Sequence, residues 1–194
     1  MPMFQQIARC TFLLLTFRAG PQDLPYLPQY TYRFCLAGGI PVFMVYSMAL
    51  PPGLALVMAA STVLGMGLVT YLILRLRGLE PRFTQTFHAL LASNGLLTLL
   101  MVPPFALVAP QIIELASNPD LLQDPQAARL PGGPVFLMNL LNLWNFAVTA
   151  GIFRHAANVA FGWGILLALL AAFSVLMVVL MLGILGGSLL GLGG

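Results

Sequence analysis

Charged side chains are the first thing that this sequence lacks. Asp, Glu, Lys and Arg make up 7% of its residues, against roughly a quarter in an ordinary soluble domain. Eight basic and five acidic side chains cannot form a charged coat around a chain of 194 residues that is 60% hydrophobic. The composition therefore excludes a soluble globular domain and predicts an integral membrane protein.

Lysine is absent altogether, so the net charge of +3 is carried by arginine. The eight arginines stand singly or in one short loop, rather than in a dense basic stretch. Nucleic-acid-binding surfaces usually need such a concentration of positive charge. We therefore expect no nucleic-acid partner, and we interpret the arginines as markers of membrane topology.

Cysteines and the sequence motifs of enzymes are scarce too. Cys10 and Cys35 lie in apolar surroundings without redox or metal-ligand spacing, which is typical of small buried hydrophobic residues. The sequence has no G-x-S-x-G elbow, no H-E-x-x-H pair, no P-loop and no G-x-G-x-x-G turn. His88 and His155 lack a third metal ligand. We expect no enzymatic activity, no cofactor and no metal.

Long apolar runs are what the sequence does have. They are too long and too unbroken for the alternating strands of an outer-membrane barrel, so they predict helices. We expect an all-α, integral membrane helical bundle with five transmembrane helices. The predicted spans cover about 34–50, 54–74, 83–102 with a continuation over 105–115, 135–153 and 159–185.

Prolines and charges mark the ends of these spans. Pro51-Pro52 predicts a tight turn between the first two, because a residue that precedes proline is biased away from helix. Arg75 to Arg82 carries three arginines and must be a loop at the membrane surface. Pro103-Pro104 kinks or ends the third span, residues 114–133 form an acidic loop, and Arg154-His155 marks the last turn.

The N-terminal apolar run, residues 4–17, is too short to be a span. As a helix it would extend about 21 Å, against about 30 Å of hydrocarbon. We interpret it as an interfacial helix in the membrane plane, in preference to a span that its neighbours extend. Three prolines within 18–29 predict an ordered linker. The predicted regions are 1–33 (interfacial helix and linker), 34–186 (five-span domain) and 187–194 (glycine-rich tail).

The arginines test the count of five spans. With five spans, seven arginines fall on one side and Arg129 falls alone on the other. The positive-inside rule then predicts a cytoplasmic N-terminus and a C-terminus outside. The seven are Arg9, Arg18, Arg33, Arg75, Arg77, Arg82 and Arg154.

Uncharged polar residues follow one side of the fourth span. Asn139, Asn142, Asn145 and Thr149 fall within about 120° of the helix circumference at 100° per residue. Such a stripe either bonds neighbouring helices or lines a small wet cavity. Both interpretations stay open from the sequence.

The third span has polar residues as well. Thr84, His88, Asn94 and Thr98 lie along it, and His88 stands one or two turns from the arginine loop. A proton relay through His88 would need acidic or basic partners, and no predicted span contains Asp, Glu or Lys. The alternative is a neutral imidazole that is hydrogen-bonded near the cytoplasmic interface.

The order of these segments resembles that of the bacterial members of the Yip family of five-span membrane proteins. The local likenesses are F-T-Q-T-F-H-A-L-L-A at Phe83 to Ala92, and Trp144-Asn145-Phe146 through Gly151-Ile152 into the last turn. The resemblance implies a protein of the bacterial inner membrane that binds other membrane proteins or shapes membranes without catalysis. The D-L-Y-G-P motif of eukaryotic relatives is missing, so binding of small GTPases is not implied.

Two hypotheses for function follow. The first is a non-enzymatic accessory or scaffold subunit that binds membrane lipids, other membrane proteins, or itself through glycine-bearing helix faces such as Gly38-Gly39 and Gly65. Its cytoplasmic basic surface would attract anionic headgroups or an acidic partner. The alternative is a small transporter or channel that is lined by the asparagine stripe and His88. The basic surface consists of Arg75, Arg77, Arg82 and Arg154.

Overall fold

The computed structural model describes residues 3–118, 120–121 and 129–189, and every regular element in these ranges is helical. The all-α class predicted from the sequence is therefore confirmed for this part of the chain. The elements are α1 (Met3–Leu15), η1 (Pro21–Asp23), η2 (Pro28–Tyr30), α2 (Thr31–Ser47), α3 (Pro52–Leu76), η3 (Glu80–Arg82), α4 (Phe83–Ser117), α5 (Gly132–Ala156) and α6 (Phe161–Leu189).

Four helices, α3, α4, α5 and α6, are long and apolar enough to cross a membrane. They have 25, 35, 25 and 29 residues. At 1.5 Å per residue, even the shortest extends about 38 Å, which exceeds the hydrocarbon core of a bilayer. α2 has 17 residues and extends about 25 Å. The fold is consistent with a multi-pass membrane protein.

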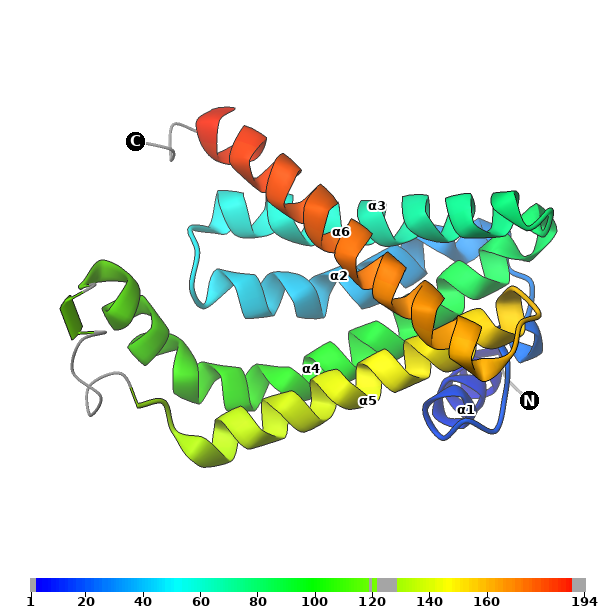
Figure 1. The fold of residues 1–194 in the computed structure, drawn as a ribbon, viewed down its shortest axis with the longest axis horizontal. Helices are drawn as coiled ribbons and strands as arrows, with labels where there is room; N and C mark the ends of the chain where they lie inside the picture. The colour runs from blue at the N-terminus through cyan, green and yellow to red at the C-terminus, as the bar shows by residue number, and fades with distance from the viewer. Residues whose placement is uncertain (1–2, 119, 122–128, 190–194) are drawn as a thin grey trace.

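The helices run back and forth along the long axis of the molecule (Figure 1). α2, α4 and α6 begin at the end where α3 and α5 finish, and α6 crosses its neighbours obliquely. α1 lies at this same end and is viewed nearly along its axis, so it runs across the bundle. We call this end the arginine end, because it has the seven arginines that the topology argument grouped together. The opposite end, with the turn between α2 and α3, is the far end.

α4 is the longest helix and passes through three prolines, Pro103, Pro104 and Pro110. Each proline lacks an N–H and crowds the carbonyl four residues earlier, which bends a helix. Figure 1 shows the far-end part of α4 turning away from the direction of its first part. Pro103-Pro104 therefore kinks the helix; the alternative, that this pair ends it, is wrong. Glu114, expected in a loop, lies in the last turn of α4.

Other boundaries differ from the prediction by a few residues. α2 begins at Thr31 rather than at 34, so Arg33 lies in its first turn. α6 continues through Gly186 to Leu189, so the predicted glycine-rich tail is helical over 187–189. The linker before α2 is ordered by η1 and η2, each of which begins at a proline. Of the predicted acidic loop, 114–133, residues 119 and 122–128 lie outside the described residues, whereas 114–117 belong to α4 and 132–133 belong to α5.

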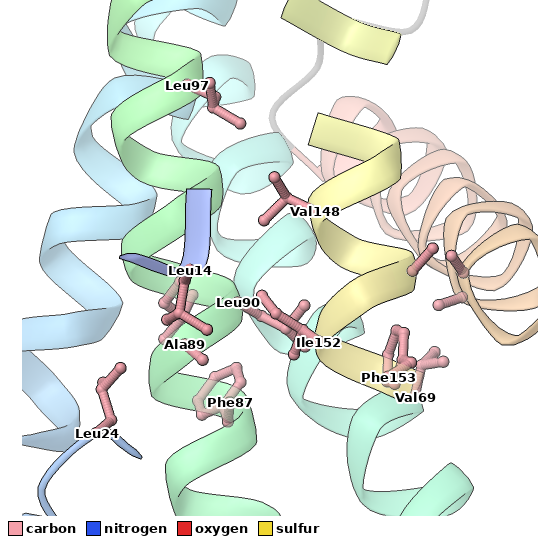
Figure 2. Close-up of a cluster of buried hydrophobic side chains, with 14 of the residues drawn as sticks. Leu14, Leu24, Val69, Phe87, Ala89, Leu90, Leu97, Val148, Ile152 and Phe153 are labelled. Carbon is pink, nitrogen blue, oxygen red and sulfur yellow. The ribbon is translucent and has the colours of Figure 1, made fainter. Parts of the chain in front are cut away.

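The hydrophobic core lies toward the arginine end. Figure 2 shows its members from several elements: Leu14 of α1, Leu24 of the linker, Val69 of α3, Leu90 of α4 and Ile152 of α5. The buried residues of α5 all lie between 148 and 156. The outer sixteen residues of α5 therefore keep their side chains at least partly exposed, and its fully buried side chains lie in the nine residues nearest the arginine end.

Glycines allow the closest helix contacts. A Cβ atom on Gly95 of α4 would collide with the carbonyl oxygen of Ala37 of α2, and one on Gly65 of α3 would lie 3.3 Å from Val178 of α6. A Cβ on Gly38 would lie 2.8 Å from a methyl of Leu91. The glycine faces predicted for self-assembly are thus occupied by packing within the chain.

Candidate functional site

A cavity of about 290 Å³ lies among α3, α4, α5 and α6, and we call it the central cavity. Asn94 of its wall lies eleven residues into α4, which is about 17 Å along the helix axis. Ala168 lies seven residues into α6, or about 10 Å. The cavity is therefore at a depth where a membrane would surround it with hydrocarbon. Its polar lining residues are Thr62, Thr70, Asn94, Asn142, Asn145 and Thr149.

Most of the polar stripe predicted on the fourth span reaches this cavity. Asn142, Asn145 and Thr149 line it, and Asn94 completes the wall from α4. Asn139 lies one turn nearer the far end, is exposed, and does not line the cavity. The stripe was visible in the sequence because its polar residues recur at helical spacing.

Sequence reasoning missed the wall from α3, to which Thr62 and Thr70 contribute hydroxyl groups. Eight residues apart, they lie about 80° from each other on the helix, so they belong to one broad face. Two threonines on one face of a mostly apolar helix were a signal for this lining. α6 contributes only small or branched apolar side chains, such as Ala168 and Val175.

One hydrogen bond crosses the polar wall. The Asn145 amide nitrogen donates to Oδ1 of Asn94 at 2.9 Å and joins α5 to α4. Oδ1 of Asn145 and Oγ1 of Thr70 are buried and have no hydrogen-bond partner among the described residues. Leaving a buried polar group unpaired costs about 1–3 kcal/mol. The wall therefore has hydrogen-bonding capacity that the chain does not use.

His88 lies apart from the central cavity, against the start of α2. It is fully buried, its ring stacks on Phe34 at 4.1 Å between centroids, and its Nε2 is 2.9 Å from Oγ1 of Thr31. The Thr31 hydroxyl donates its single proton to the carbonyl of Pro28 at 2.8 Å, so it accepts a hydrogen bond from Nε2–H. This geometry supports the interpretation of His88 as a neutral, hydrogen-bonded imidazole. It does not support the interpretation in which His88 lines a pore.

A second cavity, of about 430 Å³, lies at the arginine end, and we call it the arginine cavity. Arg82 donates from Nη1 to the carbonyls of Ala156 (3.1 Å) and His155 (3.3 Å), and so caps the end of α5. Arg154 is exposed at the rim of the cavity. No side chain with a carboxylate lines this cavity among the described residues. The lining residues are Gln22, Arg82, Gln85, Arg154, His155, Asn158 and Val159.

The predicted basic surface is thus divided. Arg82 and Arg154 share the arginine cavity, whereas Arg75 and Arg77 lie at the end of α3 and do not line it. The Arg75 guanidinium lies 6.0 Å from the ring centroid of Tyr71, within reach of a cation–π contact.

The C-terminal end of α1 is fixed to α5. Nε1 of Trp144 donates to the carbonyl of Leu15 at 3.1 Å, and the Trp144 and Phe17 rings meet edge to face at 5.6 Å. Phe4 and Phe12 on α1 are exposed by 80% and 64%. The helix therefore presents aromatic side chains outward while its other side covers the bundle.

Within the described ranges, no three His, Cys, Asp or Glu side chains come together in a way that could hold a metal ion. Comparison of the chain with protein-family models, with curated proteins and with solved structures gave no match. The chemistry of the two cavities is therefore the basis for assigning a function.

Proposed function

We propose that this chain is a non-enzymatic, multi-pass membrane protein that acts as an accessory or scaffold subunit and binds lipids and other membrane proteins. The observation that carries the proposal is the arginine cavity. Two guanidinium groups, from Arg82 and Arg154, lie at its wall, and none of the side chains described there is a carboxylate. Guanidinium groups bind phosphate oxygens in bidentate geometry. The surface therefore suits an anionic lipid headgroup.

The proposal includes five spans, with α2 as the first. α2 runs antiparallel to α3 in Figure 1, and it packs on α4 where Gly95 meets Ala37. If α2 crosses the membrane together with the four longer helices, the arginine end is the cytoplasmic side and the C-terminus is outside. We propose that the membrane is the bacterial inner membrane.

An in-plane position for α1 is part of the same proposal. Its 13 residues extend about 20 Å, too short to span, and the helix runs across the bundle at the arginine end (Figure 1). The exposed Phe4 and Phe12 would enter the acyl chains, and Arg9 would remain near the headgroups. Lipid headgroups would then lie beside the arginine cavity.

Lipid selectivity tests the proposal. The purified protein in micelles that contain equal amounts of phosphatidylglycerol and phosphatidylcholine should retain phosphatidylglycerol preferentially in native mass spectrometry. Arg154→Gln should reduce that preference, because each arginine near an anionic surface contributes about 1 kcal/mol. Arg154 is the better target, because Arg82 also caps α5.

The matched control is Arg129→Gln, which removes the arginine that lies outside the arginine end. It should leave the lipid preference unchanged. Equal retention of the two lipids by the unaltered protein would contradict the proposal. An equal loss of the preference for phosphatidylglycerol in Arg154→Gln and in Arg129→Gln would also contradict the proposal.

Membership in the Yip family remains a proposal. What supports it is the order of elements, an N-terminal helix followed by α2 to α6, together with a site that suits binding rather than catalysis. Those features agree with the accessory role that the resemblance implies.

A second candidate function is a small transporter or channel, which the central cavity favours. Asn142→Leu and Asn145→Leu should then abolish the passage of small neutral solutes, such as glycerol or urea, into proteoliposomes. If the asparagines serve packing alone, the same variants should lose stability and the unaltered protein should show no flux above that of empty liposomes.

A further inference from the structure

We propose that the central cavity is a binding site for a small, uncharged molecule with hydroxyl or amide groups on one side and apolar surface on the other. The inference deepens the second candidate function by naming a class of ligand. It does not depend on the arginine cavity, because the two sites share no lining residue.

The hydroxyl of Thr70 is the first reason. A threonine or serine in a helix commonly bonds the carbonyl four residues earlier, and α3 has two examples. Ser61 donates to Val57 at 2.7 Å, and Thr62 donates to Met58 at 2.9 Å. Thr70, with 1% exposure, makes no hydrogen bond within the described residues although it lines the cavity. Its hydroxyl is thus left for a molecule inside the cavity.

α5 supplies the complementary group. Asn145 uses its amide nitrogen to reach Asn94, which leaves its buried Oδ1 unpaired within the described chain. Asn142 lies one turn away on the same wall. A hydroxyl or amide group in the cavity could donate to Oδ1 of Asn145 and accept from Oγ1 of Thr70. A purely apolar molecule would leave both atoms unpaired.

The rest of the lining sets the charge and size of the ligand. No charged side chain lines the central cavity among the described residues, so an ion there would be unpaired in low-dielectric surroundings. Phe146 and Phe153 of α5 and Ala171 and Val175 of α6 belong to the apolar part of the lining. At about 30 Å³ per molecule, 290 Å³ corresponds to roughly ten water molecules. The ligand is therefore neutral, compact and apolar on one side.

Three probes of nearly equal shape test this chemistry. Cyclohexane-1,2-diol is neutral and forms hydrogen bonds, cyclohexane-1,2-diamine is positively charged at neutral pH, and 1,2-dimethylcyclohexane is apolar. Each is titrated into the full-length protein in detergent while the thermal unfolding midpoint is recorded. The diol should raise the midpoint in a saturable way, because a molecule that binds the folded state alone stabilises it by mass action. The diamine and the dimethyl compound should not.

Substitutions in the lining test whether the diol binds in the central cavity. Thr70→Val keeps the shape of the side chain and removes a hydroxyl that bonds to no atom of the described residues, so the unfolding midpoint without probe should not fall. In Thr70→Val, the diol concentration that gives half of the shift in the unfolding midpoint should rise about tenfold. In the double variant with Thr70→Val and Asn142→Leu, it should rise further. Ser93→Ala is the matched control, since the Ser93 hydroxyl is buried, lies outside the cavity and has no hydrogen-bond partner among the described residues. It should respond to the diol like the unaltered protein.

Three outcomes would overturn the proposal. Equal shifts with all three probes would mean nonspecific partition into the micelle. Equal shifts in the unaltered protein and in the double variant would place the diol elsewhere. No shift with any probe would mean that the cavity holds water alone. Lipid selectivity at the arginine end would be unaffected by any of these results, so the two proposals fail separately.

Discussion

At the residue scale, His88 shows how a polar side chain is accommodated near the end of a membrane helix. Its ring stacks on Phe34, and its Nε2–H donates a hydrogen bond to the Thr31 hydroxyl. The Thr31 hydroxyl in turn donates to the carbonyl of Pro28. Nδ1 remains buried and has no partner within the described residues. One helix, α4, is thereby linked to the first turn of α2 through a neutral imidazole. We infer that His88 fixes the start of α2.

A double-mutant cycle measures that link. His88→Phe keeps an aromatic ring beside Phe34 but removes the hydrogen bond, and Thr31→Val removes the other partner. We expect a coupling free energy of about 0.5–1.5 kcal/mol between the two substitutions in reversible unfolding in mixed detergent micelles, the usual net value of one hydrogen bond. Additive effects would show that His88 and Thr31 do not interact. Thr16→Val paired with His88→Phe is the control, because the Thr16 hydroxyl donates to carbonyls of α1 and not to His88.

At the element scale, the contact between α2 and α4 leaves no space for an added methyl group. In Gly95→Ala, the new Cβ would meet the carbonyl oxygen of Ala37, so the two helix backbones must separate. Such overpacking typically costs 1–3 kcal/mol, and we expect a loss of about that size in the same unfolding measurement.

Gly162→Ala is the matched control for Gly95→Ala. Gly162 is also helical, but a Cβ there meets no atom within 4 Å among the described residues. Alanine is the better helix former, so stability should stay equal or rise slightly. A similar loss in both variants would contradict an effect that is specific to the α2–α4 contact.

Sequence patterns predicted the helices better than their contacts. Apolar runs gave α3, α5 and α6 to within a few residues, since a hydrocarbon environment demands helices of that length. The path through Pro103 and Pro104 was left open, because proline breaks helices in water. In hydrocarbon a broken helix would expose more unpaired backbone groups, so the helix bends and continues.

The central cavity could be predicted in part. Periodicity placed Asn142, Asn145 and Thr149 on one side of a helix, but it could not say which neighbour that side meets. The pairing with Asn94 and the contribution of Thr70 from α3 depend on how four helices pack. Local sequence spacing has no information on such contacts. For the same reason, His88 was grouped with the stripe although it faces α2.

At the scale of the whole molecule, the positions of the arginines predict the orientation in the membrane. In a variant with Cys10 and Cys35 replaced by serine, single cysteines are introduced as Arg77→Cys, Asn158→Cys and Ser117→Cys. A membrane-impermeant thiol reagent should label Ser117→Cys in intact bacterial cells with a permeabilised outer membrane. It should label Arg77→Cys and Asn158→Cys only after the cells are lysed, because both positions lie at the arginine end.

Labelling of Arg77→Cys and Ser117→Cys from the same side would contradict five spans, because α4 alone separates the two positions. Labelling of Asn158→Cys from the opposite side to Arg77→Cys would contradict the pairing of α4 and α5. Labelling of Arg77→Cys and Asn158→Cys in intact cells would contradict the cytoplasmic assignment of the arginine cavity.

The confinement of buried residues on α5 to positions 148–156 has a mechanical consequence. From Ile152 to Phe136 the axis of α5 extends about 24 Å, so a tilt of about 10° about the buried segment would displace Phe136 by roughly 4 Å. Hydrogen bonds from Asn145 to Asn94 and from Gln111 to the carbonyl of Arg129 join this part of the chain to α4. Such a tilt would therefore move the far-end parts of α4 and α5 together.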